Sequence, residues 1–161
     1  MSQFALAEMQ RPLGPSAQAE DAYAALYHAS PLERIALIRQ GIPAAEAKRI
    51  LDDLDLGQGV GLRALNLPVA TVNKKAKLGE RLTTDESERV LGFARLVGQL
   101  EAMVAESGEA EAFDAHGWMA RWLMEPLPAL GHRRPADFLD TMEGQALIAT
   151  ALAQMQSGAY A

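Results

Sequence analysis

The chain has 161 residues, of which 49% are apolar and 22% are charged, and its net charge is -6 at neutral pH. This balance is typical of a soluble globular protein with one domain or two small ones. The sequence contains no cysteine, which excludes disulfides, thiolate metal sites and cysteine nucleophiles, and it contains no apolar run of the roughly 20 residues that span a bilayer.

The first segment, MSQFALAEMQRPLGPSAQ, has no basic start followed by an apolar core, so it does not have the pattern of a secretory signal. We expect residues 1–29 to form an N-terminal arm with room for one short helix. We further expect a cytoplasmic protein that does not contact a membrane, and the lack of cysteine is compatible with that reducing compartment.

Helical rather than alternating apolar periodicity runs through nearly every later segment, which predicts an all-α fold. In SPLERIALIRQG, Ser30 and Glu33 have the spacing of a capping box, Pro31 suits the first helical position, and Gly41 ends a helix of about ten residues. A second helix begins at Pro43 and places its apolar residues on one face: Ala47, Ile50, Leu51 and Leu54.

The next segment is basic in an acidic chain, since residues 58–81 hold 5 Lys/Arg against 1 Asp/Glu, whereas residues 100–161 hold 3 against 9. A basic block between acidic flanks predicts one surface for a polyanion and a different surface for another partner. The order VGLRAL-NLP-VATVNKKAKLG is that of a helix-turn-helix. Asn66 is expected at its tight turn because asparagine tolerates the left-handed backbone conformation.

On the second helix of this unit, Val69, Val72 and Ala76 are expected to face inward, which leaves the polar and basic side chains for the DNA groove and its phosphates. The predicted DNA-binding residues are Arg63, Thr71, Asn73, Lys74, Lys75, Lys77 and Arg81. A typical helix-turn-helix has an apolar residue where this chain has Lys75, so a merely polar helix of an interaction domain remains an alternative. Exchange of Lys74 and Lys75 for glutamate is the test that the pattern suggests.

The longest predicted helix begins at Thr83 or Thr84, where TTDE offers another capping box, and ends at Gly108. Its apolar stripe is long enough to serve both the core and a dimer seam: Val90, Phe93, Ala94, Val97, Leu100 and Val104. Two more helices are predicted over about residues 110–124 and 142–156. They are joined by EPLPALGHRRP, a rigid connection whose last proline, Pro135, opens a short turn of helix.

No arrangement of residues in the sequence predicts chemistry. His28, His116 and His132 are far apart and lack the spacing of metal ligands, and GQGVGL lacks the third glycine and the preceding strand of a dinucleotide fingerprint. We therefore expect no catalytic residue, no metal site and no cofactor. A helical enzyme or enzyme subunit is the alternative from another class, and no residues in the chain support it.

Two sequence patterns extend beyond the helix-turn-helix. At the start of the long helix, LTTDESERVLGF contains Leu82, Glu86-Ser87 and Arg89. The C-terminal half contains a longer series: Trp122-Leu123, Pro126, Leu130-Gly131, Pro135, Leu139, Thr141, Gly144, Gly158 and Tyr160. Together these patterns resemble the Xre/MbcA/ParS antitoxin family over roughly residues 41–161. Leu127 and His132 depart from the family pattern, which often has asparagine and a second glycine at these positions.

The resemblance implies the antitoxin of a type II toxin-antitoxin system, usually encoded beside a RES-domain toxin that depletes NAD⁺. Such an antitoxin binds its toxin, occludes the NAD-binding cleft and represses its own operon by binding operator DNA. We expect a homodimer, an Xre-like helix-turn-helix DNA-binding and dimerisation region over residues 30–105, and a toxin-binding domain over residues 106–161. The alternative is a free-standing transcriptional regulator whose C-terminal half only dimerises.

The toxin-binding residues are predicted on two grounds: some are of types enriched at interface hot spots, and others lie at the end of the chain. They are Trp122, Arg133, Arg134, Gly158, Tyr160 and Ala161. The four-residue spacing of Trp118 and Trp122 favours a shared place in the core, and the two arginines are equally suited to capping nearby helix ends. Tyr160 follows a helix-ending glycine, where little core is left to enter, which favours an interface.

Overall fold

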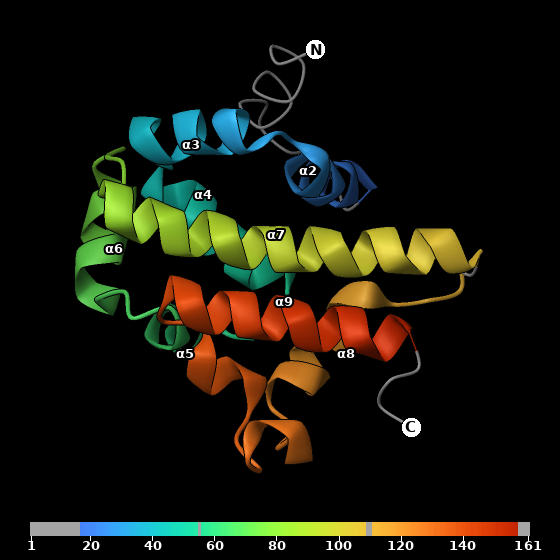
Figure 1. The fold of residues 1–161 in the computed structure, drawn as a ribbon. Helices are drawn as coiled ribbons and strands as arrows, with labels where there is room; N and C mark the ends of the chain where they lie inside the picture. The colour runs from blue at the N-terminus through green and yellow to red at the C-terminus, as the bar shows by residue number, and fades with distance from the viewer. Residues whose placement is uncertain (1–16, 55, 109–110, 158–161) are drawn as a thin grey trace.

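The structure is a computed structural model that describes residues 17–54, 56–108 and 111–157. These residues form eight α-helices and two 3-10 turns without a strand (Figure 1), which confirms the predicted all-α class. The helices are α2 (Ala17–His28), α3 (Pro31–Gln40), α4 (Ala44–Asp53), α5 (Gln58–Ala64), α6 (Val69–Lys77), α7 (Thr84–Ser107), α8 (Ala115–Leu123) and α9 (Met142–Gln156). The turns are η1 (Pro128–Leu130) and η2 (Pro135–Phe138).

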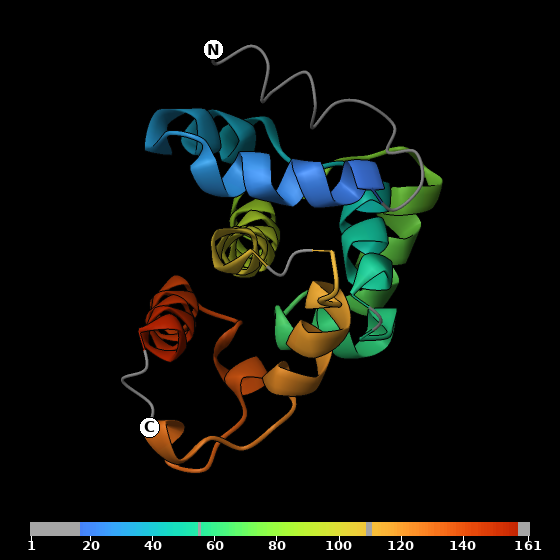
Figure 2. The ribbon, with the colours of Figure 1, turned by 90° about the vertical axis from the view of Figure 1, so that its right-hand side faces the viewer.

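Helix α7 runs through the middle of the molecule. Seen along its axis in Figure 2, it has α2 and α3 on one side, α9 on the opposite side, and α4, α5 and α6 across a third side. The predicted capping box fixes its start, because the Glu86 amide donates to Thr83 Oγ1 at 3.2 Å and the Thr83 amide donates to Glu86 Oε2 at 2.9 Å. Gly108, at φ 80°, ends the helix in the left-handed conformation.

The apolar stripe of α7 is buried within a single chain. Residues from Val90 to Leu100 on this stripe lie under α2 and α9, and Val104 is half-buried. From Val90 to Leu100 the stripe therefore belongs to the core. The expectation that part of α7 also forms a dimer seam stays a prediction.

Helix α2 is part of this core, although the sequence predicts only an arm with room for a short helix. Tyr23 and Leu26 are buried against α7, and the Tyr23 hydroxyl donates to Asp53 Oδ2 of α4 at 3.1 Å. A Cβ atom on Gly98 would lie 2.1 Å from the Tyr23 carbonyl oxygen, so the glycine is what permits the close crossing of α2 over α7. Residues 1–16 of the predicted arm lie outside the described residues.

The C-terminal helices continue the same core. Helix α8 begins at Ala115 rather than near residue 110, because Asp114 Oδ1 accepts from the Gly117 amide at 3.0 Å and caps it there. Helix α9 has the predicted bounds, and Thr141 caps it. The buried residues of α2 to α9 form one continuous cluster, and the expected boundary between residues 105 and 106 falls inside the last turn of α7.

Candidate functional site

Helices α5 and α6 form the predicted helix-turn-helix. Asn66 lies in the turn between them at φ 55°, in the left-handed conformation expected for this position. Val72 is fully buried, and Val69 and Ala76 pack partly buried against the core. These three contacts fix which side of α6 faces outward.

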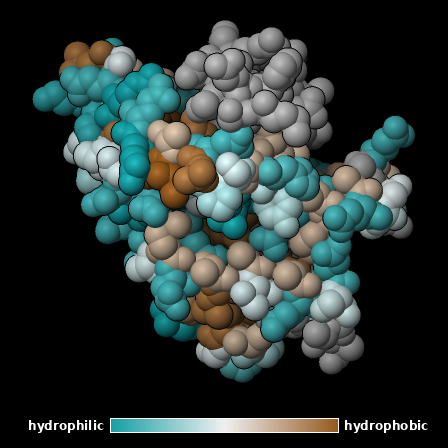
Figure 3. Space-filling view, turned by 45° about the horizontal axis from the view of Figure 1, so that its top comes forward, coloured by the Kyte–Doolittle hydropathy of each residue, from teal (hydrophilic) through white to brown (hydrophobic). Residues whose placement is uncertain are grey.

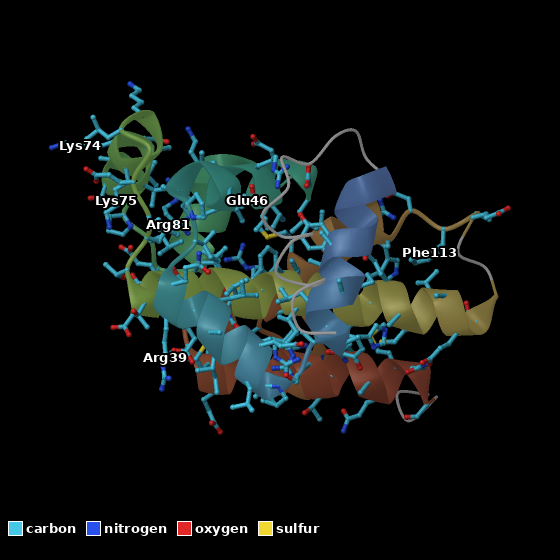
Figure 4. All side chains as sticks on the ribbon, turned by 90° about the horizontal axis from the view of Figure 1, so that it is seen from above. Arg39, Glu46, Lys74, Lys75, Arg81 and Phe113 are labelled. Atoms are coloured by element: carbon cyan, nitrogen blue, oxygen red, sulfur yellow. The ribbon has the colours of Figure 1, made fainter. Side chains whose placement is uncertain are left out.

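The outward side of α6 presents three of the predicted DNA-binding residues. Thr71, Lys74 and Lys77 are exposed, and Figure 4 shows Lys74 pointing away from the body of the molecule. Lysines on the outer face of a second helix are placed to neutralise phosphates, and Thr71 near its start is placed to reach base edges. The exposure of these three residues agrees with the predicted DNA-binding role, which stays a prediction.

Lys75 and Asn73, by contrast, turn toward the protein. Lys75 Nζ lies 3.4 Å from Glu86 Oε2 at the start of α7, and its side chain is 20% exposed. Burial raises the pKa of Glu86, but the hydrogen bond from the Thr83 amide and the charge of Lys75 outweigh it and lower that pKa overall. Asn73 is half-buried, and its Oδ1 has no hydrogen-bond partner among the described residues. Lys75 thus joins α6 to α7, in the place where a helix-turn-helix usually has an apolar contact.

The two predicted arginines at the ends of the unit lie in different surroundings. Arg81 is an exposed residue, but its guanidinium donates a partly buried hydrogen bond to the Gly41 carbonyl at 2.7 Å. Arg63 is exposed at the rim of a hollow of about 350 Å³ between α5 and the η2 turn, which Arg134 and Asp137 also line. The structure therefore brings together two arginines that the sequence assigns to different partners.

Arg89 and Ser87 belong to the sequence pattern at the start of the long helix, and the structure shows what their side chains contact. Arg89 donates through Nε to the Leu65 carbonyl at 2.8 Å and through Nη2 to the Asn66 carbonyl at 3.3 Å, so it ties α7 to the turn of the helix-turn-helix. Ser87 Oγ is buried and accepts from the Ile42 amide at 2.9 Å. From the first turns of α7, Arg89 therefore holds the turn of the helix-turn-helix, and Ser87 holds the segment between α3 and α4.

We expect Arg89→Ala to weaken binding to operator DNA about tenfold and to lower the free energy of unfolding by about 1–2 kcal/mol, because two hydrogen bonds from a charged donor are lost. Anisotropy titration and urea unfolding measure the two effects. Arg95→Ala, at an exposed position of the same helix, is the matched control and is expected to change neither appreciably. Equal behaviour of the two variants would show that Arg89 does not position the turn.

The described toxin-binding candidates divide into one core residue and two surface residues. Trp122 is 5% exposed, and its ring stacks on that of Trp118 at 5.6 Å between centroids, so it is a core residue in the free chain. Arg134 is exposed and pairs with Asp137 at 2.8 Å across the start of η2, and this hydrogen bond lowers the pKa of Asp137. The Arg133 guanidinium carbon lies 4.6 Å from the ring centroid of Phe138. Gly158, Tyr160 and Ala161 lie outside the described residues.

The fold and the exposed face of α6 define a helix-turn-helix protein whose C-terminal helices share the same core. Residues 33–95 match the sequence model of the antitoxin Xre-like helix-turn-helix domain. Residues 109–158 match that of the antitoxin Xre/MbcA/ParS C-terminal toxin-binding domain. The chain belongs to the Xre/MbcA/ParS antitoxin family, which is not an enzyme family.

Individual relatives agree with this assignment. The Prs ADP-ribosylating antitoxin of Sphingobium sp. (strain YBL2) is 58% identical over 140 residues, which cover 87% of this chain and 88% of the relative. The antitoxin Xre of Yersinia enterocolitica is 24% identical over 153 residues, covering 83% of this chain and 97% of the relative. Over the described part of the chain, no helix is both long and apolar enough to cross a membrane.

Proposed function

We propose that this protein neutralises a toxin that consumes NAD⁺ by covering the toxin's NAD-binding cleft, and that it represses its own operon by binding operator DNA. The observation that carries the proposal is one folded body with an exposed lysine face on α6 and a C-terminal part that matches a toxin-binding domain. Charge supports this division, because the basic segment 58–81 attracts DNA whereas the acidic segment 100–161 is repelled by it.

For the chemistry of the toxin, we propose ADP-ribosylation. The relative with 58% identity is named for ADP-ribosylation of Prs, whereas the sequence resemblance implies a RES-domain toxin that depletes NAD⁺. Both reactions cleave the bond between nicotinamide and ribose, so covering the NAD⁺ cleft inhibits either one. Incubation of the toxin with NAD⁺ and Prs distinguishes the two reactions. ADP-ribose bound to Prs indicates transfer, whereas free ADP-ribose indicates hydrolysis.

We also propose that two copies of the chain form the operator-binding unit, since helix-turn-helix proteins read paired half-sites about one DNA turn apart. We propose helix α3 as the surface for this contact, because it carries the most exposed large apolar side chain among the described residues. None of its residues is buried, Leu32 is 79% exposed and Ile35 is 40% exposed. Figure 3 brings the side of the molecule with α2 and α3 toward the viewer and shows brown apolar areas set in a mainly hydrophilic surface.

Deletion of residues 158–161 is expected to weaken toxin neutralisation while operator binding stays unchanged. The deleted tail contains Tyr160, an aromatic residue of the type that anchors interfaces, and it follows α9 rather than the DNA-reading helices. The full chain is expected to stop release of nicotinamide by the purified toxin, and the truncated chain to require at least about tenfold more protein for the same inhibition.

The same pair of proteins is compared for rescue of growth when the toxin is expressed. Equal inhibition and equal rescue by the truncated chain would refute the role of the tail. Failure of the full chain to bind or inhibit the toxin would refute the proposed function itself.

A further inference from the structure

Helix α9 presents an outer face almost without charge. Its 15 residues include one charged side chain, Glu143 in the first turn, in a chain of which 22% is charged. The exposed positions after Glu143 include Ala146, Leu147, Thr150, Ala153 and Gln154. Since the solvent-facing side of a helix normally carries charged residues, this face has the composition of a surface that becomes buried in a complex.

Two hollows flank this face. A hollow of about 480 Å³ is lined in part by Phe138, Leu147 and Thr150, with Glu143 also in its lining. Another of about 320 Å³ between α7 and α9 is lined in part by Leu96 and Met142, with Arg95 as the one charged residue among the described residues that line it. Ala146 lines both hollows and so forms the ridge between them. A small ridge residue lets the backbone of a partner approach closely while its larger side chains enter the hollows, as in well-packed interface cores.

The wall of the larger hollow is fixed in the free chain. Arg133 holds the Phe138 ring from one side, with its guanidinium carbon 4.6 Å from the ring centroid. Gly144 packs so closely on the Phe138 carbonyl that a Cβ atom would lie 1.9 Å from the oxygen. A wall that is already ordered loses little entropy when a partner binds. Arg133, a predicted toxin contact, therefore acts at least in part by shaping this hollow.

We propose that the toxin docks on this α9 face, with apolar side chains of the toxin filling the hollows on either side of Ala146. The inference rests on the proposed function, because it locates the toxin on this chain. One observation identifies the occupant: helix α9 lies within the residues that match a toxin-binding domain.

The test uses the full chain and the purified toxin encoded in the neighbouring reading frame. Leu147→Asp is expected to weaken toxin affinity at least about 100-fold, because a carboxylate would replace an apolar side chain that becomes buried in the complex. Melting temperature and operator binding are expected to stay unchanged, since Leu147 is 45% exposed in the free chain. Leu78→Asp makes the same exchange at a leucine that is 60% exposed and lies outside the residues that match the toxin-binding domain, and it is expected to retain toxin affinity.

The outcomes separate this inference from the proposed function. Wild-type toxin affinity in a folded Leu147→Asp variant would overturn the inference alone, whereas lack of toxin binding by the wild-type chain would overturn the proposed function. Loss of self-association in Leu147→Asp, with full toxin binding, would assign the face to a second copy and also overturn the inference. Should Leu147→Asp fail to fold, Ala146→Glu at the exposed ridge replaces it, with the same expected loss of toxin affinity.

Discussion

Exchange of both Lys74 and Lys77 for glutamate is expected to weaken operator binding by about 100- to 1,000-fold near physiological salt, with no change in fold. Both side chains are exposed on the outward side of α6, beside Thr71. Each lysine that neutralises a phosphate releases counterions from the DNA, so the slope of log affinity against log salt is expected to fall by about two. Anisotropy titration of DNA from upstream of the gene, at several salt concentrations, measures both quantities.

Lys75→Glu is the informative control for this experiment. Its carboxylate would face that of Glu86, which now lies 3.4 Å from the Lys75 ammonium, so the free energy of unfolding is expected to fall by about 1 kcal/mol. The exchange that the sequence alone suggests, of Lys74 with Lys75, therefore mixes lost DNA contact with damage to the fold. Operator binding by the Lys74/Lys77 variant at wild-type strength would refute the assignment of α6 as the DNA reader.

Gly144→Ala is expected to destabilise the protein by about 3 kcal/mol and to lower its melting temperature by about 6–10 °C. The added Cβ atom would lie 1.9 Å from the Phe138 carbonyl oxygen and 2.9 Å from Thr141 Oγ1. The carbonyl belongs to the backbone, so relief of the contact requires the η2 turn to move away from α9. Thermal unfolding followed by circular dichroism measures the shift.

Gly59→Ala provides a matched change in a helix where space is available. The new Cβ atom would meet only the guanidinium of Arg63, at 3.3 Å, and that exposed side chain can move away. Alanine also has the higher helix propensity, by about 0.8–1.0 kcal/mol, so the melting temperature is expected to hold or rise slightly. Comparable loss of stability in the two variants would mean that the contact between Gly144 and Phe138 is not the cause.

Local signals were sufficient to predict much of this fold. Helices α3 and α7 are capped at their starts by Ser30 and Thr83, whose capping boxes are recognisable in the sequence from a glutamate three residues later. Gly41 and Gly108 end the two helices. Asn66 predicted the turn of the helix-turn-helix because few residues adopt φ 55° readily. Each of these elements is specified by residues that are adjacent in sequence, so no knowledge of tertiary contacts is needed.

The sequence is least informative where a distant residue decides the surroundings of a side chain. Lys75 was predicted to reach DNA because its basic neighbours suggested one continuous patch, but Glu86, eleven residues later, attracts its ammonium group. Trp122 is among the toxin-binding candidates although its spacing from Trp118 favours the core, and the structure shows it buried. The alanine-rich α2 has a weak apolar pattern, and its place in the core depends on Gly98, seventy-five residues after Tyr23.

The residues by which the chain resembles its family mostly build the fold. Leu130, Pro135 and Leu139 are buried, and Thr141 begins α9. His132, where a second glycine is common in the family, has φ 62°, which explains the preference for glycine at this position. The four residues of the family pattern therefore serve the architecture of the C-terminal helices.

Gln145 of α9 joins the two halves of the molecule. Its Nε2 donates to the Leu139 carbonyl and to the carbonyl of Arg89, each at 3.0 Å, and the guanidinium of Arg89 in turn binds the turn before α6. A chimaera that exchanges the C-terminal half for that of another antitoxin would disrupt these contacts within the core, since the two halves are not joined by a mere linker. The helix-turn-helix and the C-terminal helices are therefore expected to fold as one unit, and a working chimaera is expected to need Gln145 and the two carbonyls that it binds to be kept together.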